Sequence, residues 1–449
     1  MNFYLTILAI LVIFHAVASK NHKTLVFLSI LSIIADNFRT IYFGPSLLLI
    51  NIVGFAVIPL LVANSNFIKR NINKYTKPFI AEYVYLILLG VLFGFIIPWE
   101  DITGLRTLTQ QAQGRTVVTL IRMLNEFAIM FYFAWVIYFK KIELDTIVLF
   151  FAITSLFSFW IGLIDYNFDY VIKEHLFYAA DNIRGRFVGL NFEPKKLGRH
   201  AALAYGIIFY YYLYIKKKQI LLFAIITNVI AVVLSSSASS FILFVLINFI
   251  VLKNFKSRFS KYYIIFIALI ILTFSVLQEY VFDFTYSKVQ KAIMGVEDFW
   301  IPNEPKLFTR FDIFDRLSLI FLWNNPKYLI SGVGPNLISI PASEFIPSTS
   351  IFSLEGRIDS VPNVFLINVL SRSGIIGVLL YLVGLLRIYR LTKNNSILQA
   401  YLLLAVLTNM VYVDPFFLVI VGIIIGKQQT ANSKHNTIQS LRAPCFRQG

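Results

Sequence analysis

The sequence predicts an all-α, polytopic membrane protein with about 12 or 13 transmembrane helices and one large external loop. Hydrophobic residues make up 58% of the 449 residues and charged residues only 14%, whereas soluble domains are nearer half apolar and a quarter charged. Apolar runs of about 18 or more residues, long enough to cross a hydrocarbon core as helices, recur along the chain. The connections between the runs are alternately rich and poor in Lys and Arg, as expected for a chain that crosses a membrane repeatedly.

The expected spans follow one another along the whole chain. They fall near residues 2–19, 24–43, 45–63, 79–97, 117–139, 146–164, 199–215, 219–234, 236–252, 262–277, 363–386, 398–412 and 414–426. Taking each run as one helix gives the larger number of spans, and merging two runs into a re-entrant element gives the smaller. The first ten helices then occupy residues 1–277, and the C-terminal helices occupy residues 363–426.

Basic residues assign a side of the membrane to each connection. The basic connections are 20–23, 69–77, 140–141, 216–218, 253–261 and 387–393. The positive-inside rule places them, with the basic tail 427–449, in the cytoplasm. The other connections are then external, and they include 98–116, 165–198 and the large loop 278–362. The net charge of +17 comes mostly from cytoplasmic flanks that face anionic lipid, so it does not indicate nucleic-acid binding.

The external connection 165–198 runs against this charge pattern. Its second half and the start of the next span read "RGRFVGLNFEPKKLGRH". The charged residues there are Arg184, Arg186, Glu193, Lys195, Lys196 and Arg199. Two interpretations stay open: a solvated loop long enough to escape the rule, or an anion site at the outer membrane boundary. Guanidinium groups suit such a site because their planar fork makes paired hydrogen bonds to phosphate oxygens.

Charges inside an apolar run indicate a second polar region. Arg122 and Glu126 lie four residues apart in the run 117–139, so a helix places them on one side. Ion pairs in lipid are expensive and usually face a bundle interior or a wet cavity. The pair is either part of a site or a structural bridge between helices.

The large external loop contains three informative stretches. "KLFTRFDIFDRLSLIFLWNNP", residues 306–326, predicts an amphipathic helix at the interface, with Arg310, Asp312, Asp315 and Arg316 facing water or headgroups. "SGVGPN", residues 331–336, contains two glycines that permit a tight turn. "LEGRIDSVPN", residues 354–363, places Glu355, Arg357 and Asp359 just before a span, and that span carries Arg372 inside it.

These motifs and their order resemble the Wzy and O-antigen ligase superfamily of polysaccharide-assembly membrane enzymes. The resemblance rests on "RGRFVGLNFEP", on the hydroxyl-rich helix start "LSSSASSFILFVL", and on "GVGPN" followed by "PNVFLINVLSRSGIIG". It covers nearly the whole chain in organisation. The ligase branch carries a histidine before the Asn of the last motif, whereas Pro362 precedes Asn363 here. Many members carry Glu where Arg372 stands. The missing histidine favours a polymerase over a ligase.

The resemblance implies a multi-pass protein of the bacterial inner membrane whose large external loop is periplasmic. A polymerase of this type joins undecaprenyl-diphosphate-linked oligosaccharide repeat units into O-antigen, capsule or exopolysaccharide at the periplasmic face. A sugar hydroxyl displaces a diphosphate at an anomeric carbon, so fixed cations stabilise the charge that gathers on the leaving group. The implied partners are the lipid-linked oligosaccharide, membrane lipids and a chain-length regulator protein.

The expected site residues follow from the motifs. The catalytic residues are Arg184, Arg186, Glu193 and Asp359, and the substrate-binding residues are Arg122, Arg199, Arg357 and Asn363. Glu193 is either the general base or a brace that orients an arginine. No cofactor and no metal are expected, because the sequence has no Asp-x-Asp pair or His cluster and only one cysteine, Cys445.

Three alternatives stay open. An O-antigen ligase would transfer finished polymer to the lipid A core. A flippase for lipid-linked oligosaccharides would be expected to show related halves and short external loops, and the sequence shows neither. A noncatalytic scaffold of the assembly complex is compatible with every residue named above.

Overall fold

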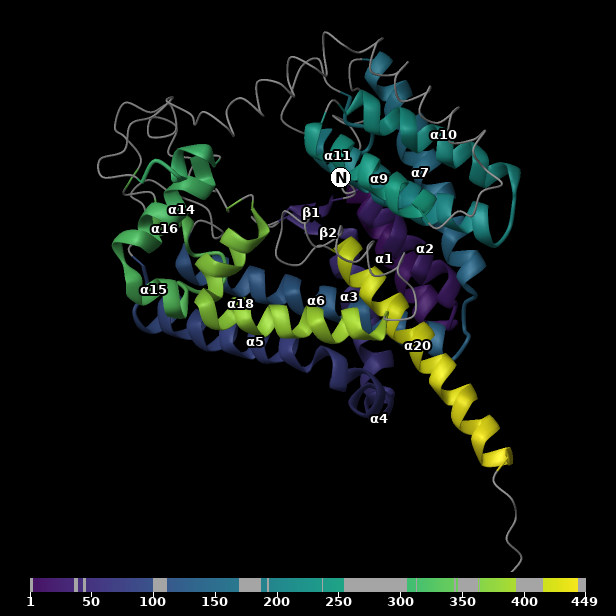
Figure 1. The fold of residues 1–449 in the computed structure, drawn as a ribbon, viewed down its shortest axis with the longest axis horizontal. Coiled ribbons are helices and arrows are strands. Elements are labelled where there is room, and N and C mark those ends of the chain that lie inside the picture. Colours follow the sequence, from purple (N-terminus) through teal and green to yellow (C-terminus); the bar gives the residue numbers. More distant parts are fainter. Residues whose placement is uncertain are drawn as a thin grey trace, which may run out of the picture.

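A computed structural model shows the chain as a mainly helical protein (Figure 1). The structure describes residues 3–35, 39–42, 46–99, 111–168, 187–191, 194–235, 237–253, 305–311, 313–342, 345, 362, 364–392 and 415–442. The predicted helical class is confirmed for this part of the chain. The expected spans 262–277 and 398–412 lie outside the described residues.

The described elements follow in chain order. The helices before the large loop are α1 (Phe3–Ala18), α2 (His22–Ile34), α3 (Leu49–Ala63), α4 (Ser65–Phe67), α5 (Asn73–Val91), α6 (Ala112–Tyr138), α7 (Leu144–Asn167), α9 (Pro194–Tyr214), α10 (Gln219–Leu234) and α11 (Ala238–Lys253). The later ones are α14 (Ile313–Asn324), α15 (Pro326–Ser331), α16 (Ser339–Ala342), α18 (Phe365–Leu391) and α20 (Pro415–Arg442). Wider π-helical turns η1 (Ile68–Ile72) and η2 (Leu92–Ile96) flank α5, and the 3₁₀ turn η4 (Phe308–Arg310) precedes α14.

Among the residues that the structure describes, four helices are long and apolar enough to cross a membrane. They are Tyr75–Ile96, which combines α5 with η2, and then Ala112–Tyr138, Leu144–Asn167 and Phe365–Leu391. Shorter apolar helices cover Thr6–Ala18, His22–Ile34, Leu49–Ala63, Gln219–Leu234 and Pro415–Thr430. The chain is therefore a helical protein with several helices suited to a membrane, while the full number of spans stays a prediction.

A small hairpin replaces the expected junction between the second and third spans. α2 ends at Ile34, and strands β1 (Arg39–Tyr42) and β2 (Ser46–Leu48) pair antiparallel before α3 begins. The expected continuous helix over 24–43 is therefore wrong after residue 34. The β-branched and aromatic side chains of Thr40, Ile41 and Tyr42 favour a strand, and Pro45 lacks the amide hydrogen that a continuing helix needs.

Several helix ends that are predicted to lie on the cytoplasmic side contact one another. Lys216, just after α9, forms an ion pair with Asp145 in the first turn of α7. Gln429 of α20 donates a hydrogen bond from Nε2 to the Tyr75 hydroxyl at the start of α5, at 3.2 Å. The ring of Phe67 packs against the last turn of α6. Every one of these ends is predicted to be cytoplasmic, so ends assigned to one side do meet.

α6 forms the centre of the bundle and packs closely against α20, α3 and α5. Two glycines of α20, one helical turn apart, make the approach to α6 possible. A Cβ atom on Gly422 would lie 2.5 Å from the carbonyl oxygen of Met130, and one on Gly426 would lie 2.7 Å from that of Ala134. This spacing is the small-xxx-small pattern that lets helix backbones pack closely in membranes.

Helix α18 is interrupted, and a turn from the large loop occupies the interruption. Gly374 has φ 62° and ψ −166°, so the helical hydrogen-bond ladder stops there. The freed carbonyls of Ser371 and Arg372 accept hydrogen bonds from the amides of Val333 and Gly334, at 2.9 and 3.0 Å. We call residues 332–336 the inserted turn.

The inserted turn enters between α5 and α18, which lie side by side with α14, α15 and α16 gathered at one end of the pair (Figure 1). Gly332 and Gly334 have φ values of 77° and 98°, which only glycine adopts without strain. The predicted tight turn is confirmed, and its place within α18 makes it part of the bundle. Irregular backbone at this depth is tolerated because protein groups surround and satisfy it.

A labelling experiment tests the assigned sides. In a Cys445→Ser background, Lys306→Cys before η4 and Lys217→Cys after α9 both place a thiol at an exposed position. A membrane-impermeant maleimide should label the first variant in intact cells and the second only after the membrane is permeabilised, because the two positions are assigned to opposite sides. Labelling of Lys217→Cys in intact cells would contradict the assignment.

Candidate functional site

Buried charges from three helices meet beside the interruption in α18. Glu82 of α5 is fully buried, and its Oε1 accepts a hydrogen bond from the Ser373 hydroxyl at 2.9 Å. Arg372, which is 7% exposed, interacts electrostatically with Glu82 and, to a smaller extent, with Glu126 of α6. We call Glu82, Glu126, Arg372 and Ser373 the interhelical charge cluster. Buried charges of this kind are retained only where opposite charges and hydrogen bonds compensate the loss of water.

Small residues on α18 make room for this cluster. A Cβ atom on Gly377 would lie 1.7 Å from the Ser373 hydroxyl oxygen and 3.4 Å from Oε1 of Glu82. Only glycine fits there without displacing the hydrogen bond between Ser373 and Glu82. Gly377 therefore allows α5 to approach α18 closely, with a carboxylate between them.

α5 also holds the inserted turn. The Tyr85 hydroxyl, one turn after Glu82, donates a hydrogen bond to the carbonyl oxygen of Ser331 at 2.8 Å. A Cβ atom on Gly90 would lie 3.1 Å from Cγ of Pro335, so the turn follows α5 toward its C-terminal end. On the other side, a Cβ on Gly332 would lie 2.4 Å from the Arg372 carbonyl oxygen. The turn is therefore enclosed between the two helices, directly against the backbone of Arg372.

The segment around α14 to α16 covers the same end of the bundle and buries further charges. Arg115, in the first turn of α6, is 3% exposed and donates from Nη1 to the hydroxyl of Ser339 in α16. Asp315 of α14 accepts a hydrogen bond from the amide of Val364, just before α18, at 2.9 Å. Asp315 and Arg316 are each only 1% exposed. The expectation that these two residues face water is wrong, because α14 packs against α18 and α16 and turns its charged side inward.

We call the segment from α14 to α16 the cap. Aromatic rings pack between the cap and the end of α5. Trp99, after η2, packs against Phe321 of α14 and Tyr328 of α15, with ring centroids 5.9 and 5.3 Å apart. Phe93 stacks on Trp99 at 5.8 Å. These contacts join the C-terminal end of α5 to α14 and α15, so the cap is packed onto the bundle through an apolar cluster of its own.

A second polar region surrounds the start of α9. Arg199 and His200 are 6% and 5% exposed, and Nδ1 of His200 lies 3.1 Å from Oδ1 of Asn191. The His200 ring also stacks on Phe416 of α20. A Cβ atom on Gly198 would lie 2.3 Å from the hydroxyl oxygen of Ser235, so the hydroxyl-rich start of α11 and its preceding turn lie directly against α9. Two motifs that are far apart in the sequence thus share one buried region.

The predicted site residues divide into two groups. Arg122 lies half-buried on α6, one turn before Glu126. Arg199 is buried in the first turns of α9. This helix begins at Pro194 rather than at the expected residue 199. The others lie outside the described residues: Arg184, Arg186, Glu193, Arg357, Asp359 and Asn363. Their roles stay predictions.

Sequence reasoning missed Glu82, Arg115 and Arg316 as members of buried polar regions. Glu82 was detectable as the single acidic residue inside the expected span 79–97. Comparison with models of known protein families gave no match, and no curated protein matched the chain. The fold and the site therefore define the class: a mainly helical protein whose described part contains four helices suited to crossing a membrane, with charged side chains buried between helices.

Removing one charge of the interhelical charge cluster should destabilise the protein. In Glu82→Gln the amide oxygen can still accept from Ser373, but Arg372 loses its main opposite charge. We expect the free energy of unfolding in detergent to fall by about 3–5 kcal/mol, the usual cost of breaking a buried pair. The matched control is Glu143→Gln, at an exposed position before α7, which should change it by less than about 0.5 kcal/mol.

Adding Arg372→Gln to Glu82→Gln should recover part of the lost stability, because the buried charge of Arg372 is then removed together with its main opposite charge. Equal stability of Glu82→Gln and Glu143→Gln would show that the cluster does not hold the helices together.

Proposed function

We propose that the chain is a membrane-embedded glycosyltransferase of the polysaccharide-polymerase type. It joins oligosaccharide repeat units carried on undecaprenyl diphosphate at the periplasmic face of the bacterial inner membrane. The observation that carries the proposal is a set of buried arginines toward the end of the bundle predicted to be external: Arg115, Arg199, Arg316 and Arg372. The reaction expels a diphosphate, and fixed cations in a poorly hydrated site stabilise the charge that develops on it.

The reaction is a displacement at an anomeric carbon. The hydroxyl of an acceptor sugar forms a bond to the anomeric carbon of the donor glycan, and the bond from that carbon to the diphosphate oxygen breaks. The hydroxyl proton goes to a carboxylate base, for which Glu193 and Asp359 are the candidates. Undecaprenyl diphosphate leaves with its negative charge held by arginines, among which Arg184 and Arg186 are the first candidates.

Substrate binding requires cations along the path of the lipid carrier. Arg122, Arg199, Arg357 and Asn363 are the proposed contacts. Arg122 and Arg199 lie on helices α6 and α9, both of which begin at the external side in the predicted arrangement. The cap formed by α14 to α16 is also the proposed contact for a chain-length regulator, because it belongs to the largest segment predicted to be external, residues 278–362.

A flippase is the second candidate, and one observation favours it. Interrupted helices with buried charges near them form the substrate sites of many transporters. The freed carbonyls in α18, however, are already bonded to the inserted turn rather than facing an open path. This closure supports the polymerase as the better proposal.

The polysaccharide ladder of a deletion strain tests the function. Wild-type chain should restore long polymer, and Arg184→Ala or Arg186→Ala should leave single repeat units on the cell surface. The corresponding Lys variants should rescue poorly, because an ammonium group cannot make paired contacts to phosphate. Lys217→Ala, on the cytoplasmic side, is the control and should behave as wild type.

The other outcomes contradict the proposal in distinct ways. Repeat units trapped at the cytoplasmic face in the deletion strain would indicate a flippase. Free polymer that is not attached to lipid A would indicate a ligase.

A further inference from the structure

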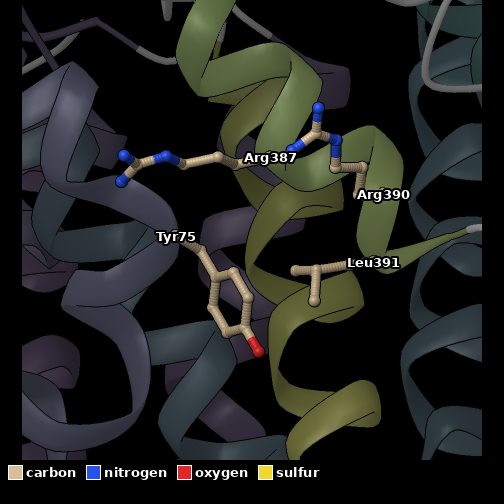
Figure 2. A pocket seen from close by; sticks show the side chains of 4 residues that line it. All are labelled: Tyr75, Arg387, Arg390 and Leu391. Carbon is tan, nitrogen blue, oxygen red and sulfur yellow. The ribbon is translucent and has the colours of Figure 1, made fainter.

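A cavity of about 350 Å³ opens at the end of the bundle opposite the cap, lined by Tyr75 of α5 and by Arg387, Arg390 and Leu391 of α18 (Figure 2). The two arginines are exposed and three residues apart, so both project from one side of α18. Figure 2 shows their guanidinium groups directed to different sides of the opening, with the Tyr75 ring beneath them. None of the four lining residues is acidic.

The surroundings of the cavity are also basic. Lys74 and Lys77 flank Tyr75 on α5, and Lys427 lies on α20, two residues before the Gln429 that bonds to the Tyr75 hydroxyl. The basic connections 69–77 and 387–393 both assign this end to the cytoplasm. The cavity therefore lies where the headgroups of the inner leaflet are expected, far from the site proposed for glycosyl transfer.

An apolar strip leads along α18 to the cavity. Leu379, Val383 and Leu386 are 57%, 43% and 54% exposed. Their spacing of three or four residues places them on one side of the helix. Arg390 follows Leu386 by four residues, so it lies on the same side. A molecule with acyl chains on this strip would place its polar head between Arg387 and Arg390.

We propose that this cavity binds the phosphate-bearing headgroup of an anionic phospholipid, with the acyl chains lying along the strip on α18. Basic pockets between helices at the cytoplasmic face suit such headgroups, and guanidinium forks bind phosphate oxygens in pairs. Because the two guanidinium groups point apart, a lipid with two phosphates, such as cardiolipin, can engage both at once. A free phosphate ion can contact only one of the two guanidinium groups, and it has no acyl chains to bind along the apolar strip on α18.

Lipid binding to the purified full-length chain tests this proposal. The delipidated protein in a neutral detergent is titrated with cardiolipin, with phosphatidylglycerol, with phosphatidylcholine or with inorganic phosphate, and the shift in Tm is recorded. We expect a saturable rise in Tm with the anionic lipids, larger for cardiolipin, and little change with phosphatidylcholine or phosphate.

Arg387→Gln with Arg390→Gln should weaken the apparent affinity for cardiolipin about 30-fold, the effect expected from two basic residues at an anionic surface. The control pair Lys217→Gln with Lys218→Gln removes the same charge from another exposed cytoplasmic turn and should weaken it by less than about threefold. Arg387→Lys with Arg390→Lys should give an intermediate loss, and it replaces the Gln pair if that variant does not fold.

Equal losses from the Gln pair and the lysine control would overturn the proposal, because binding would then follow surface charge alone. A rise in Tm with inorganic phosphate equal to that with cardiolipin would also overturn it, since the site would then recognise a soluble anion.

Discussion

Every backbone group and charge beside the interruption in α18 needs a partner inside the protein, and the rest of the site depends on this constraint. A continuous helix would bond the carbonyls of Ser371 and Arg372 to amides four residues further on. At Gly374 that ladder stops, and the inserted turn supplies the amides instead. An unsatisfied polar group in hydrocarbon costs several kcal/mol. The turn and the helix therefore fix each other, and the large loop is joined to the bundle at this point.

The same arrangement explains why charges can be buried there. Glycines at 332 and 377 bring the turn and α5 against α18, so that Glu82 lies between helices with Ser373 and Arg372 as partners. In the proposed reaction, groups held this rigidly would need no rearrangement as charge develops on the leaving diphosphate, which is the property that electrostatic catalysis requires. α18 also carries the cavity proposed to bind lipid at its other end, so one helix connects the two proposed sites.

Composition and charge predicted the helical class because the length and polarity of each apolar run can be read from the run itself. Gly332 and Gly334 predicted the turn because only glycine adopts positive φ freely. Neither signal shows which distant segment a turn or a charge will meet. Asp315 was expected to face water, and its partner is an amide in the segment before α18. The packing of α20 on α6 through Gly422 and Gly426 likewise depends on a match between two remote surfaces.

The position of the inserted turn is measured most directly by crosslinking. With Cys445→Ser as background, Tyr85→Cys and Ser331→Cys replace two residues whose hydroxyl and carbonyl lie 2.8 Å apart. The control, Val84→Cys, lies on an exposed face of α5, about 100° around the helix from position 85. A short bis-maleimide should join positions 85 and 331 in native membranes and leave 84 and 331 unjoined. Equal crosslinking of both pairs, or of neither, would show that the turn does not enter the bundle.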